Sequence, residues 1–359
     1  MNKDYIHEFQ NKLLDWYDEN RRILPWREEP SAYKVWISEI MLQQTRVDTV
    51  IPYFLKFMED IPSIFTLANI SEDKLLKLWE GLGYYSRAKN LKKAAQVLLE
   101  EYNGQMPSDK KDLQSLPGIG PYTSGAIASI AFGQKEPAMD GNVLRIVSRI
   151  TVNTGDIKNR KVKADIEQIV IDVLPENRVG DFNQALMDLG ATICIPNGAP
   201  KCSICPLSGF CEGHNKGIAE TLPVKTAKKK RNIEKKTIFV LNYGDQFALK
   251  RRPNKGLLSK LWEYPNVDGF ATEKDVRLLM KSWGFLTGSL LELNNSKHLF
   301  SHIEWHMKAY YIKVEAVQRD NDFVWASKKE IKEKYSIPTA FKEYTKWVQH
   351  LEEHQGQAI

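Results

Sequence analysis

Two carboxylates in the first half of the chain stand where acid–base chemistry could take place. Glu39 interrupts the apolar run 37–42, which has helical spacing, and Asp140 closely precedes an amphipathic segment that starts at Val143. Apolar surroundings raise the pKa of a glutamate, so that its carboxyl group can donate a proton near neutral pH. An aspartate at a helix start stays ionised and can stabilise a developing positive charge. The alternatives are a solvent-facing glutamate on a half-buried helix and an aspartate that only caps the next helix.

A tight Gly-x-Gly turn lies between two predicted helices, residues 108–115 and 121–132. Gly118 and Gly120 can adopt positive φ angles and let the backbone come close to a ligand. The N–H groups at the start of the second helix attract an anion, and a DNA phosphate is the obvious one. An ordinary helix–helix turn is the alternative interpretation, since short glycine patterns are common.

All four cysteines fall in one stretch, which favours a metal or cluster site over disulfides in a chain without an export signal. The spacing is Cys-x7-Cys-x2-Cys-x5-Cys, and the residues are Cys194, Cys202, Cys205 and Cys211. Zinc sites more often show two Cys-x2-Cys pairs separated by a longer loop. The crowded arrangement therefore favours a [4Fe–4S] cluster, with zinc as the alternative.

Composition bounds the class of protein. The chain has 359 residues and a formal net charge of +6, a mild bias that suggests an anionic partner. No apolar run approaches the roughly 18 residues that a membrane span needs, and the N-terminus lacks the apolar core of a signal peptide. We therefore expect a cytoplasmic protein of two or three domains that does not act at a membrane.

Two regions of different character are separated by a basic connector. Up to residue 215 the apolar spacing is helical, which predicts an all-α region. Residues 216–236 are rich in lysine and indicate a linker. Strand-like segments follow, which predict a separate α+β domain. The strands are predicted at 237–241, 247–250, 290–293, 297–300 and 305–314, and the helices of this domain at 273–283 and 341–351.

Several segments together resemble the adenine DNA glycosylase (MutY) family, within the helix-hairpin-helix glycosylases that include endonuclease III. The resemblance extends over nearly the whole chain, and the joint occurrence of the segments in this order is highly specific. The segments are 24–27, 38–46, 79–86, 116–123, 140–142, the four cysteines and 300–302.

The resemblance implies an enzyme that flips out an adenine mispaired with 8-oxoguanine, or with guanine, and hydrolyses its N-glycosidic bond. By the same resemblance, Glu39 is the general acid that protonates the leaving adenine. Asp140 would stabilise the oxocarbenium-like sugar or bond to it covalently. One protonated and one ionised carboxyl group also suit this chemistry on general grounds. Asn142 and Tyr122 would support Asp140 and the sugar.

Further residues are expected to contact DNA by the same resemblance. The adenine pocket is expected to contain Trp26, Arg27 and Gln184. The side chains that enter the duplex or lie beside it on the 8-oxoguanine side are expected to be Leu42, Gln44, Thr45 and Tyr84. The hairpin with Gly118 and Gly120 is expected to hold the phosphate backbone.

Two further features concern the reaction and the cysteine loop. Glycosylases of this fold that also cut the strand carry a lysine, which forms a Schiff base with the sugar, at the position of Tyr122. The chain is therefore predicted to be monofunctional, without strong strand-cutting activity. The family's [4Fe–4S] loop usually has six residues in its first gap, whereas this chain has seven. Asn197 and Gly198 could absorb the extra residue in a turn.

The C-terminal region resembles a degenerate Nudix (MutT-like) domain. If residues 283–285 mark the end of the Nudix helix, Lys281 and Ser282 stand in place of the metal-binding glutamates, so pyrophosphatase activity is not expected. Phe300, Ser301 and His302 correspond to the loop that reads 8-oxoguanine. A plain turn at a strand end is the alternative interpretation.

The predicted architecture is therefore multidomain. A helical catalytic region covers 1–215, with the helix-hairpin-helix at about 108–132 and an iron–sulfur part made from the N-terminal helix and 141–215. The linker 216–236 and the Nudix-like domain 237–359 follow. We expect a nucleoid-associated monomer acting on double-stranded DNA that contains 8-oxoguanine:adenine. The alternatives are a glycosylase for another mismatch, such as T:G, and a non-catalytic iron–sulfur protein that binds DNA.

Overall fold

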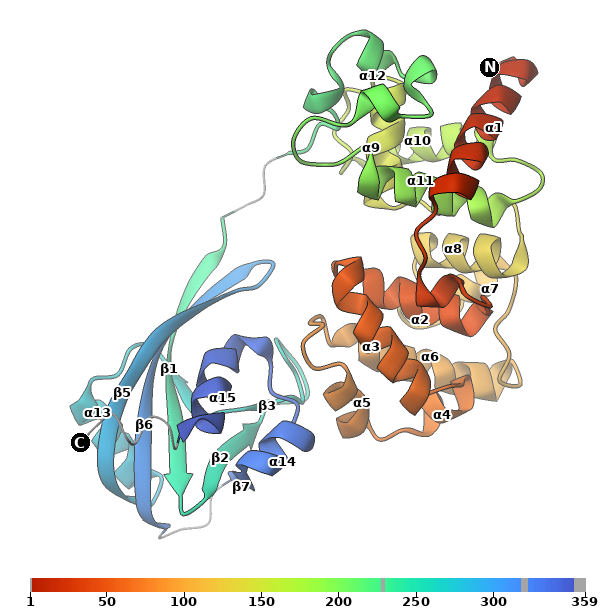
Figure 1. The fold of residues 1–359 in the computed structure, drawn as a ribbon. Helices are drawn as coiled ribbons and strands as arrows, with labels where there is room; N and C mark the ends of the chain where they lie inside the picture. Colours follow the sequence, from red (N-terminus) through yellow and green to blue (C-terminus); the bar gives the residue numbers. More distant parts are fainter. Residues whose placement is uncertain (1, 227–229, 318–321, 352–359) are drawn as a thin grey trace. The chain divides into compact units, whose positions relative to one another are not determined.

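The computed structural model of the chain describes residues 2–226, 230–317 and 322–351. The chain divides into two compact units. Unit 1 consists of Met1–Ile70 and Lys89–Ala227, and unit 2 consists of Ser71–Ala88 and Lys228–Ile359. Helices alone make up the described part of unit 1, while unit 2 contains a sheet with helices (Figure 1). The predicted fold class, a helical region followed by an α+β domain, is confirmed.

Helices and short 3-10 turns build unit 1, and none of its described residues is in a strand. The two predicted hairpin helices, 108–115 and 121–132, are confirmed to within two residues at each end. The α-helices are α1 Lys3–Asn20, α2 Ala32–Leu42, α3 Val47–Asp60, α4 Ile64–Asn69, α6 Ser86–Glu101 (from Lys89 onward), α7 Lys110–Ser115, α8 Pro121–Phe132, α9 Gly141–Ile150, α10 Arg160–Val173, α11 Val179–Thr192 and α12 Glu212–Asn215. The 3-10 turns are η1 Pro25–Arg27, η2 Cys202–Ile204, η3 Ser208–Phe210 and η4 Ala219–Thr221. No described helix combines the length and apolar character that crossing a membrane requires.

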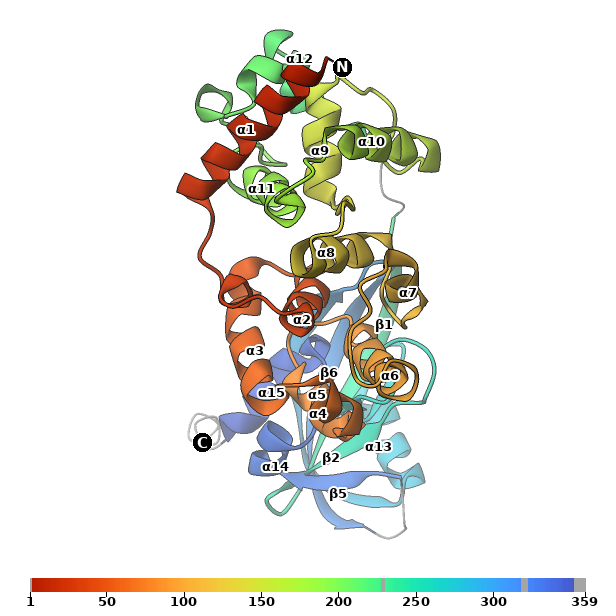
Figure 2. The ribbon, with the colours of Figure 1, turned by 90° about the vertical axis from the view of Figure 1, so that its right-hand side faces the viewer.

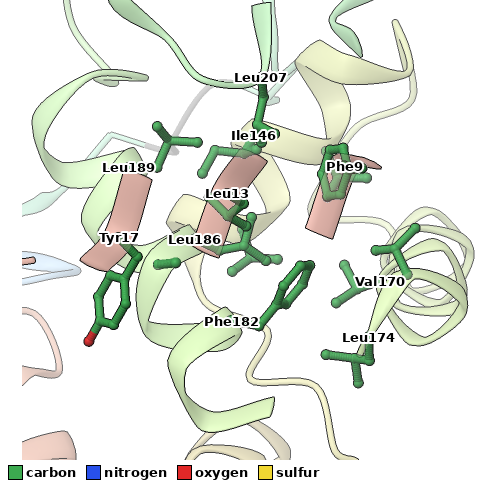
Figure 3. Close-up of a cluster of buried hydrophobic side chains, with 14 of the residues drawn as sticks. Phe9, Leu13, Tyr17, Ile146, Val170, Leu174, Phe182, Leu186, Leu189 and Leu207 are labelled. Atoms are coloured by element: carbon green, nitrogen blue, oxygen red, sulfur yellow. The ribbon is translucent and has the colours of Figure 1, made fainter. Parts of the chain in front are cut away.

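One apolar core joins the N-terminal helix to helices much later in the chain. Buried side chains from α1, α9, α10 and α11 meet there, as Figure 3 shows. The ring centroid of Phe9 lies 6.3 Å from that of Phe182 and 5.4 Å from that of Phe210. Burying such large apolar side chains contributes roughly 1.5–3 kcal/mol each. This core holds α1 against the part of the chain that carries the cysteines.

The hairpin consists of α7 and α8 (Figure 2). The Asp109 carboxylate caps α7 by accepting hydrogen bonds from the N–H groups of Lys111 and Asp112. Gly118 has the predicted positive φ, +82°. The prediction of a positive φ at Gly120 is wrong, because Gly120 is the N-cap of α8 with φ −92° and ψ −178°. Any residue can adopt that extended backbone.

Seven strands in unit 2 form one sheet with the order β3-β2-β1-β6-β5, to which β4 adds on β1 and β7 on β2. Only β1 and β6 run parallel among the described pairs. The strands are β1 Asn232–Tyr243, β2 Gln246–Arg251, β3 Trp262–Glu263, β4 Asn266–Asp268, β5 Phe285–Leu299, β6 Ile303–Val317 and β7 Val324–Ser327. The helices are α5 Glu72–Leu78, α13 Glu273–Ser282, α14 Lys328–Glu333 and α15 Lys342–Gln349, with η5 Thr339–Phe341 and the start of α6.

Two strand predictions need correction. Strand β1 begins inside the predicted linker, because the backbone from Asn232 onward pairs with β6 from Ile303 onward. Residues 227–229 of that linker lie outside the described residues. Strand β5 is continuous where two separate strands were predicted. Register shifts, one of them between Leu293 and Ser296, interrupt its alternating pattern and explain the apparent break.

The alternating side chains of β1 separate two apolar layers. Ile238 and Val240 face a core that includes Tyr344 and Val348 from the region of α15. The intervening Phe239 and Leu241 face a core with residues of α13. The sheet is therefore buried on both faces, with α13 on one side and α15 on the other (Figure 1).

Segment Ser71–Ala88 belongs to unit 2 through contacts with residues far along the chain. The Lys77 ammonium donates hydrogen bonds to the backbone carbonyls of Ile331 (3.2 Å) and Tyr335 (3.0 Å). The Glu80 carboxylate accepts one from the N–H of Ile337 at 2.6 Å. The predicted helical region 1–215 included this segment, and local sequence patterns could not reveal these distant partners.

Candidate active site

Unit 1 contains a cleft of about 890 Å³. Its walls come from the connector after α1, from α2, from α8, from the start of α9 and from α11. The predicted site residues that line it are Trp26, Arg27, Glu39, Leu42, Gln44, Thr45, Tyr122, Asp140, Asn142 and Gln184. The fold thus brings together candidates that the sequence spreads over more than half of the unit.

Glu39 projects from α2, a helix whose start is capped by the hydroxyl of Ser31. Glu39 itself is only 5% exposed. The pKa of Glu39 is raised to about 7, mainly because the carboxyl group is buried and also because of the nearby charge of Asp140. The Tyr122 hydrogen bond and the charge of Arg27 oppose the rise. A carboxyl group with this pKa is partly protonated at neutral pH and suits general acid catalysis.

Tyr122 reaches Glu39 from α8. Its hydroxyl donates a hydrogen bond to Glu39 Oε2 and lies 3.8 Å from Met187 Sδ. Burial holds the pKa of Tyr122 well above its usual value, so the phenol stays a neutral donor. Support of Asp140 by Tyr122 was expected, but the hydroxyl bonds to the other carboxyl group. A donor on this oxygen leaves Oε1 of Glu39 as the site for a transferable proton.

Asp140 is the N-cap of α9. Its Oδ1 accepts hydrogen bonds from the N–H groups of Asn142 and Val143, both at 2.8 Å, and its Oδ2 accepts one from Asn142 Nδ2 at 2.6 Å. Burial raises the pKa of Asp140, while these three donors and the positive charge of Arg145 oppose the rise. All of them stabilise the carboxylate form, so Asp140 is the better candidate for the ionised partner of Glu39.

Asn142 is held on both sides of its amide. Its Nδ2 donates to Asp140, and its Oδ1 accepts a hydrogen bond from Arg145 Nη2 at 2.9 Å. The same Arg145 donates to the carbonyls of Gly190 at 2.7 Å and Cys194 at 2.8 Å. A Cβ on Gly190 would lie 2.5 Å from the Asn142 Cβ, so α11 must present a glycine there. These bonds fix the orientation of the Asp140 carboxylate.

The turn after α2 is strained. Gln44 has φ +60°, a left-handed conformation that is uncommon for a residue with a side chain. In unit 2, Tyr84 has φ +46° and is 52% exposed. Such strain costs roughly 1–3 kcal/mol and is concentrated at ligand-binding sites. Both residues were predicted to enter the duplex, and their strained, outward positions suit that role.

Comparison with known proteins identifies the family. Residues 37–171 match the HhH-GPD superfamily of base excision DNA repair proteins, and residues 237–347 match the NUDIX domain. The adenine DNA glycosylase of Buchnera aphidicola (subsp. Schizaphis graminum) is 38% identical over 304 residues, which cover 84% of this chain and 86% of the relative. The chain belongs to the adenine DNA glycosylase family. The human adenine DNA glycosylase is 35% identical over 86% of this chain and 68% of its own length.

Solved structures show the same helical fold. A thermostable thymine-DNA glycosylase is 30% identical, with a TM-score of 0.54, and covers 59% of this chain and 98% of its own. Endonuclease III in a non-covalent DNA complex gives a TM-score of 0.52 at 21% identity over 61% of this chain and 99% of its own. Membership of the adenine DNA glycosylase family makes this chain a DNA glycosylase of base excision repair, and DNA is its partner.

In this adenine DNA glycosylase family member, the hairpin offers a matched pair of glycines. A Cβ on Gly118 would lie 2.7 Å from the Asn90 Cβ, and the φ of +82° adds strain. A Cβ on Gly120 would meet nothing within 4 Å. Gly118→Ala is therefore expected to lower the free energy of unfolding by roughly 1–3 kcal/mol, and Gly120→Ala by less than about 0.5 kcal/mol. Urea unfolding followed by far-UV circular dichroism measures both. Equal effects would contradict the assignment of strain to Gly118 alone.

The four cysteines line one small apolar cavity together with residues such as Leu207 and Pro200. The Cys194 sulfur accepts a hydrogen bond from Arg149 Nη1 at 3.2 Å. Gly198 has φ +79°, and the N–H of Lys201 bonds to the carbonyl of Ile193 at 3.0 Å. The predicted turn at Gly198 therefore closes the longer first gap without displacing the cysteines from the cavity.

The predicted reading loop forms the turn between β5 and β6. Phe300 packs its ring against His298 (4.6 Å) and Trp305 (4.9 Å). Ser301 and His302 are exposed at the tip. The Tyr84 hydroxyl lies 3.2 Å from Ser301 Oγ. Two candidate DNA-contacting residues that the sequence separates widely are thus hydrogen-bonded within unit 2.

Sequence reasoning missed Arg22, which lines the cleft, and Asp188, which lies behind its wall. Arg22 lines it beside Arg27, and both guanidinium groups pair with Asp188, whose side chain is fully buried. The sequence pattern that could have indicated Asp188 is the one that indicated Glu39, because Asp188 is a lone carboxylate in the apolar run 185–189 of a predicted helix. Its two arginine partners lie far away in the sequence, so the pattern alone could not show what neutralises it.

Proposed function

We propose that this chain removes adenine paired with 8-oxoguanine, and also adenine paired with guanine, by hydrolysing the N-glycosidic bond of an extruded nucleotide. The observation that carries the proposal is that the two carboxyl groups in the cleft favour different protonation states. Glu39 is buried with a pKa of about 7, and Asp140 accepts three hydrogen bonds that favour its ionised form. Such a pair provides one acid and one anion for a single reacting centre.

The reaction follows from these two states. The carboxylic acid of Glu39 donates its proton to a ring nitrogen of adenine, the C1′–N bond breaks, and its electron pair moves to the base. The Asp140 carboxylate stabilises the positive charge that develops on the sugar. Water then adds to C1′, and the Glu39 carboxylate accepts a proton from it. This step restores the protonated acid.

The four cysteines fit the [4Fe–4S] cluster that the family resemblance implies. They share one apolar cavity, and each would supply one thiolate ligand to the cluster. Within the described part of the chain, no three side chains of metal-ligand type gather closely enough to hold one ion. The crowded spacing of the four cysteines favours a cluster over zinc. The bound cluster would fix the loop between α11 and α12, and the reacting groups lie elsewhere.

The β5–β6 turn supports specificity for 8-oxoguanine. Ser301 and His302 are exposed hydrogen-bonding groups, and Tyr84 joins the turn through Ser301. The last turn of α13 carries Lys281 and Ser282, which cannot hold Mg²⁺ as glutamates do. Recognition, without pyrophosphate hydrolysis, is therefore the proposed role of this domain. The enzyme would act as a monomer.

A specificity for another mismatch is the alternative to adenine. The thymine-DNA glycosylase similar to this chain covers 59% of it, so a T:G substrate is a definite alternative. The additional NUDIX match at 237–347 favours the 8-oxoguanine proposal. A neutral tyrosine at 122 in place of lysine supports a monofunctional reaction that leaves an abasic site.

The test is base release from four otherwise identical duplexes, which contain A:8-oxoguanine, A:G, A:T or T:G. Each reaction is analysed with and without alkali. We expect adenine loss from the first two duplexes and strand breaks only after alkali. Release of thymine from T:G instead would overturn the proposed specificity, and breaks without alkali would overturn the monofunctional reaction. Binding without release would favour a non-catalytic DNA-binding protein.

A further inference from the structure

Asp188 lies behind the wall of the cleft, on α11. Its side chain is fully buried, and it does not line the cleft itself. Arg22 donates to it through its backbone N–H (3.2 Å), Nε (2.8 Å) and Nη2 (2.6 Å). Arg27 donates through Nη1 (2.7 Å) and Nη2 (3.0 Å). One carboxylate thus anchors two guanidinium groups.

Both arginines line the cleft, so Asp188 determines where their positive charges lie along its wall. The Arg27 side chain is 14% exposed, and its Cζ lies 5.7 Å from the centroid of the Tyr17 ring. Arg27 Nη1 also donates to the carbonyl of Arg22 at 3.1 Å. These contacts leave the guanidinium little freedom to turn.

One donor of this group is unsatisfied. Arg27 Nε is buried and has no hydrogen-bond partner among the described residues. Leaving a buried donor unpaired costs roughly 1–3 kcal/mol. The bonds from Arg27 to Asp188 have to offset this cost for the guanidinium to stay in place.

We propose that Asp188 is a positioning residue that holds Arg22 and Arg27 against the cleft wall, so that Arg27 presents a fixed positive charge to the extruded base beside Glu39. The proposal rests on the proposed function, because the ligand is the flipped base. It assigns to Asp188 a role in the rate of base release that is separate from its contribution to folding.

The electrostatics around Glu39 give a readout for this role. Tyr122 from α8, Asp140 from the start of α9 and Arg27 from η1 act on the Glu39 carboxyl group. The other charged or titratable residues that line the cleft are Tyr17, Arg21, Arg22, Glu28, Arg145, Asp181 and Lys225. Arg27 lowers the pKa of Glu39. In Asp188→Asn, the negative charge that neutralises Arg27 is gone, but the remaining side-chain oxygen can still accept a hydrogen bond from the Arg27 guanidinium. The pKa of Glu39 should then fall.

The experiment compares the wild-type full chain with Asp188→Asn and with Glu263→Gln. Glu263 is a matched control, since its side chain is 9% exposed and paired with Arg252 in unit 2. Single-turnover adenine release, affinity for the duplex and thermal stability are measured for each protein. The Glu39 titration is followed separately by carbon-13 NMR of glutamate-labelled protein, with the resonance assigned through Glu39→Gln.

We expect Asp188→Asn to slow release up to about a hundredfold, to bind duplex within about threefold of wild type, and to show a lower Glu39 pKa. Glu263→Gln should alter stability alone. An unchanged Glu39 pKa, or a rate loss no greater than that of Glu263→Gln, would overturn the positioning role. The NMR titration needs no enzymatic activity. A wild-type protein without base release would therefore refute the proposed function, while the titration would still decide whether Asp188 controls the charge that Arg27 exerts on Glu39.

Discussion

Replacing Glu39 by glutamine is expected to slow adenine release by roughly 10²–10⁴-fold, the usual contribution of a general acid. Glutamine keeps the size and the acceptor oxygen for the Tyr122 hydroxyl but has no proton to give to the leaving base. The fold should persist, because the substitution replaces a costly buried carboxyl group by a neutral amide. Single-turnover base release with saturating enzyme measures the loss.

The control for this substitution is Glu59→Gln on α3, where the side chain is 70% exposed. It makes the same substitution in unit 1 away from the cleft and should leave the rate unchanged. If Glu39→Gln released adenine as fast as Glu59→Gln, the acid would have to be another group, and the assignment of Glu39 would fail.

Replacing Asp140 by asparagine is expected to slow base release by roughly 10²–10³-fold, the typical cost of losing one preorganised electrostatic contact with a developing charge. Asparagine is nearly as good an N-cap as aspartate, so α9 should still begin at Gly141. One hydrogen bond is lost, because the amide oxygen takes the place of Oδ1 and keeps both backbone bonds, while Asn142 Nδ2 then faces the new amide nitrogen. The change separates the two roles of Asp140, since it removes the charge and keeps the cap.

The matched control is Asp109→Asn, because Asp109 caps α7 through the same kind of contacts, from the N–H groups of Lys111 (2.7 Å) and Asp112 (3.2 Å). Both variants should lose less than about 1 kcal/mol of stability, and only Asp140→Asn should lose activity. If the rate of Asp140→Asn fell only in proportion to the loss of folded protein, Asp140 would act as a helix cap and not in catalysis.

Features that depend on neighbouring residues in the chain could be predicted from the sequence. A lone carboxylate in the apolar run 37–42 was enough to select Glu39, and a position just before an amphipathic helix was enough to select Asp140. The hairpin helices followed from Pro121 and the glycine turn. In each case the signal lies within a few residues of the group that it describes.

Distant contacts could not be predicted in this way. The Tyr122 hydroxyl bonds to Glu39, which lies on another helix, and Asp188 is neutralised by arginines that follow α1. The positive φ expected at Gly120 belongs to Gly118 alone, because glycine is also acceptable at an ordinary N-cap. Register shifts in β5 disguised one strand as two, since a bulge breaks the alternation by which a strand is recognised.

The most direct test of the account is the pH dependence of kcat/KM for adenine release, which reports the essential groups of the free enzyme. Glu39 must be protonated to act, and its pKa is about 7. The rate should therefore be highest below that pH and fall about tenfold per unit well above it, and the Glu39→Gln variant should lack this decline. A wild-type rate that stays level or rises through this range would contradict a protonated Glu39 as the catalytic acid.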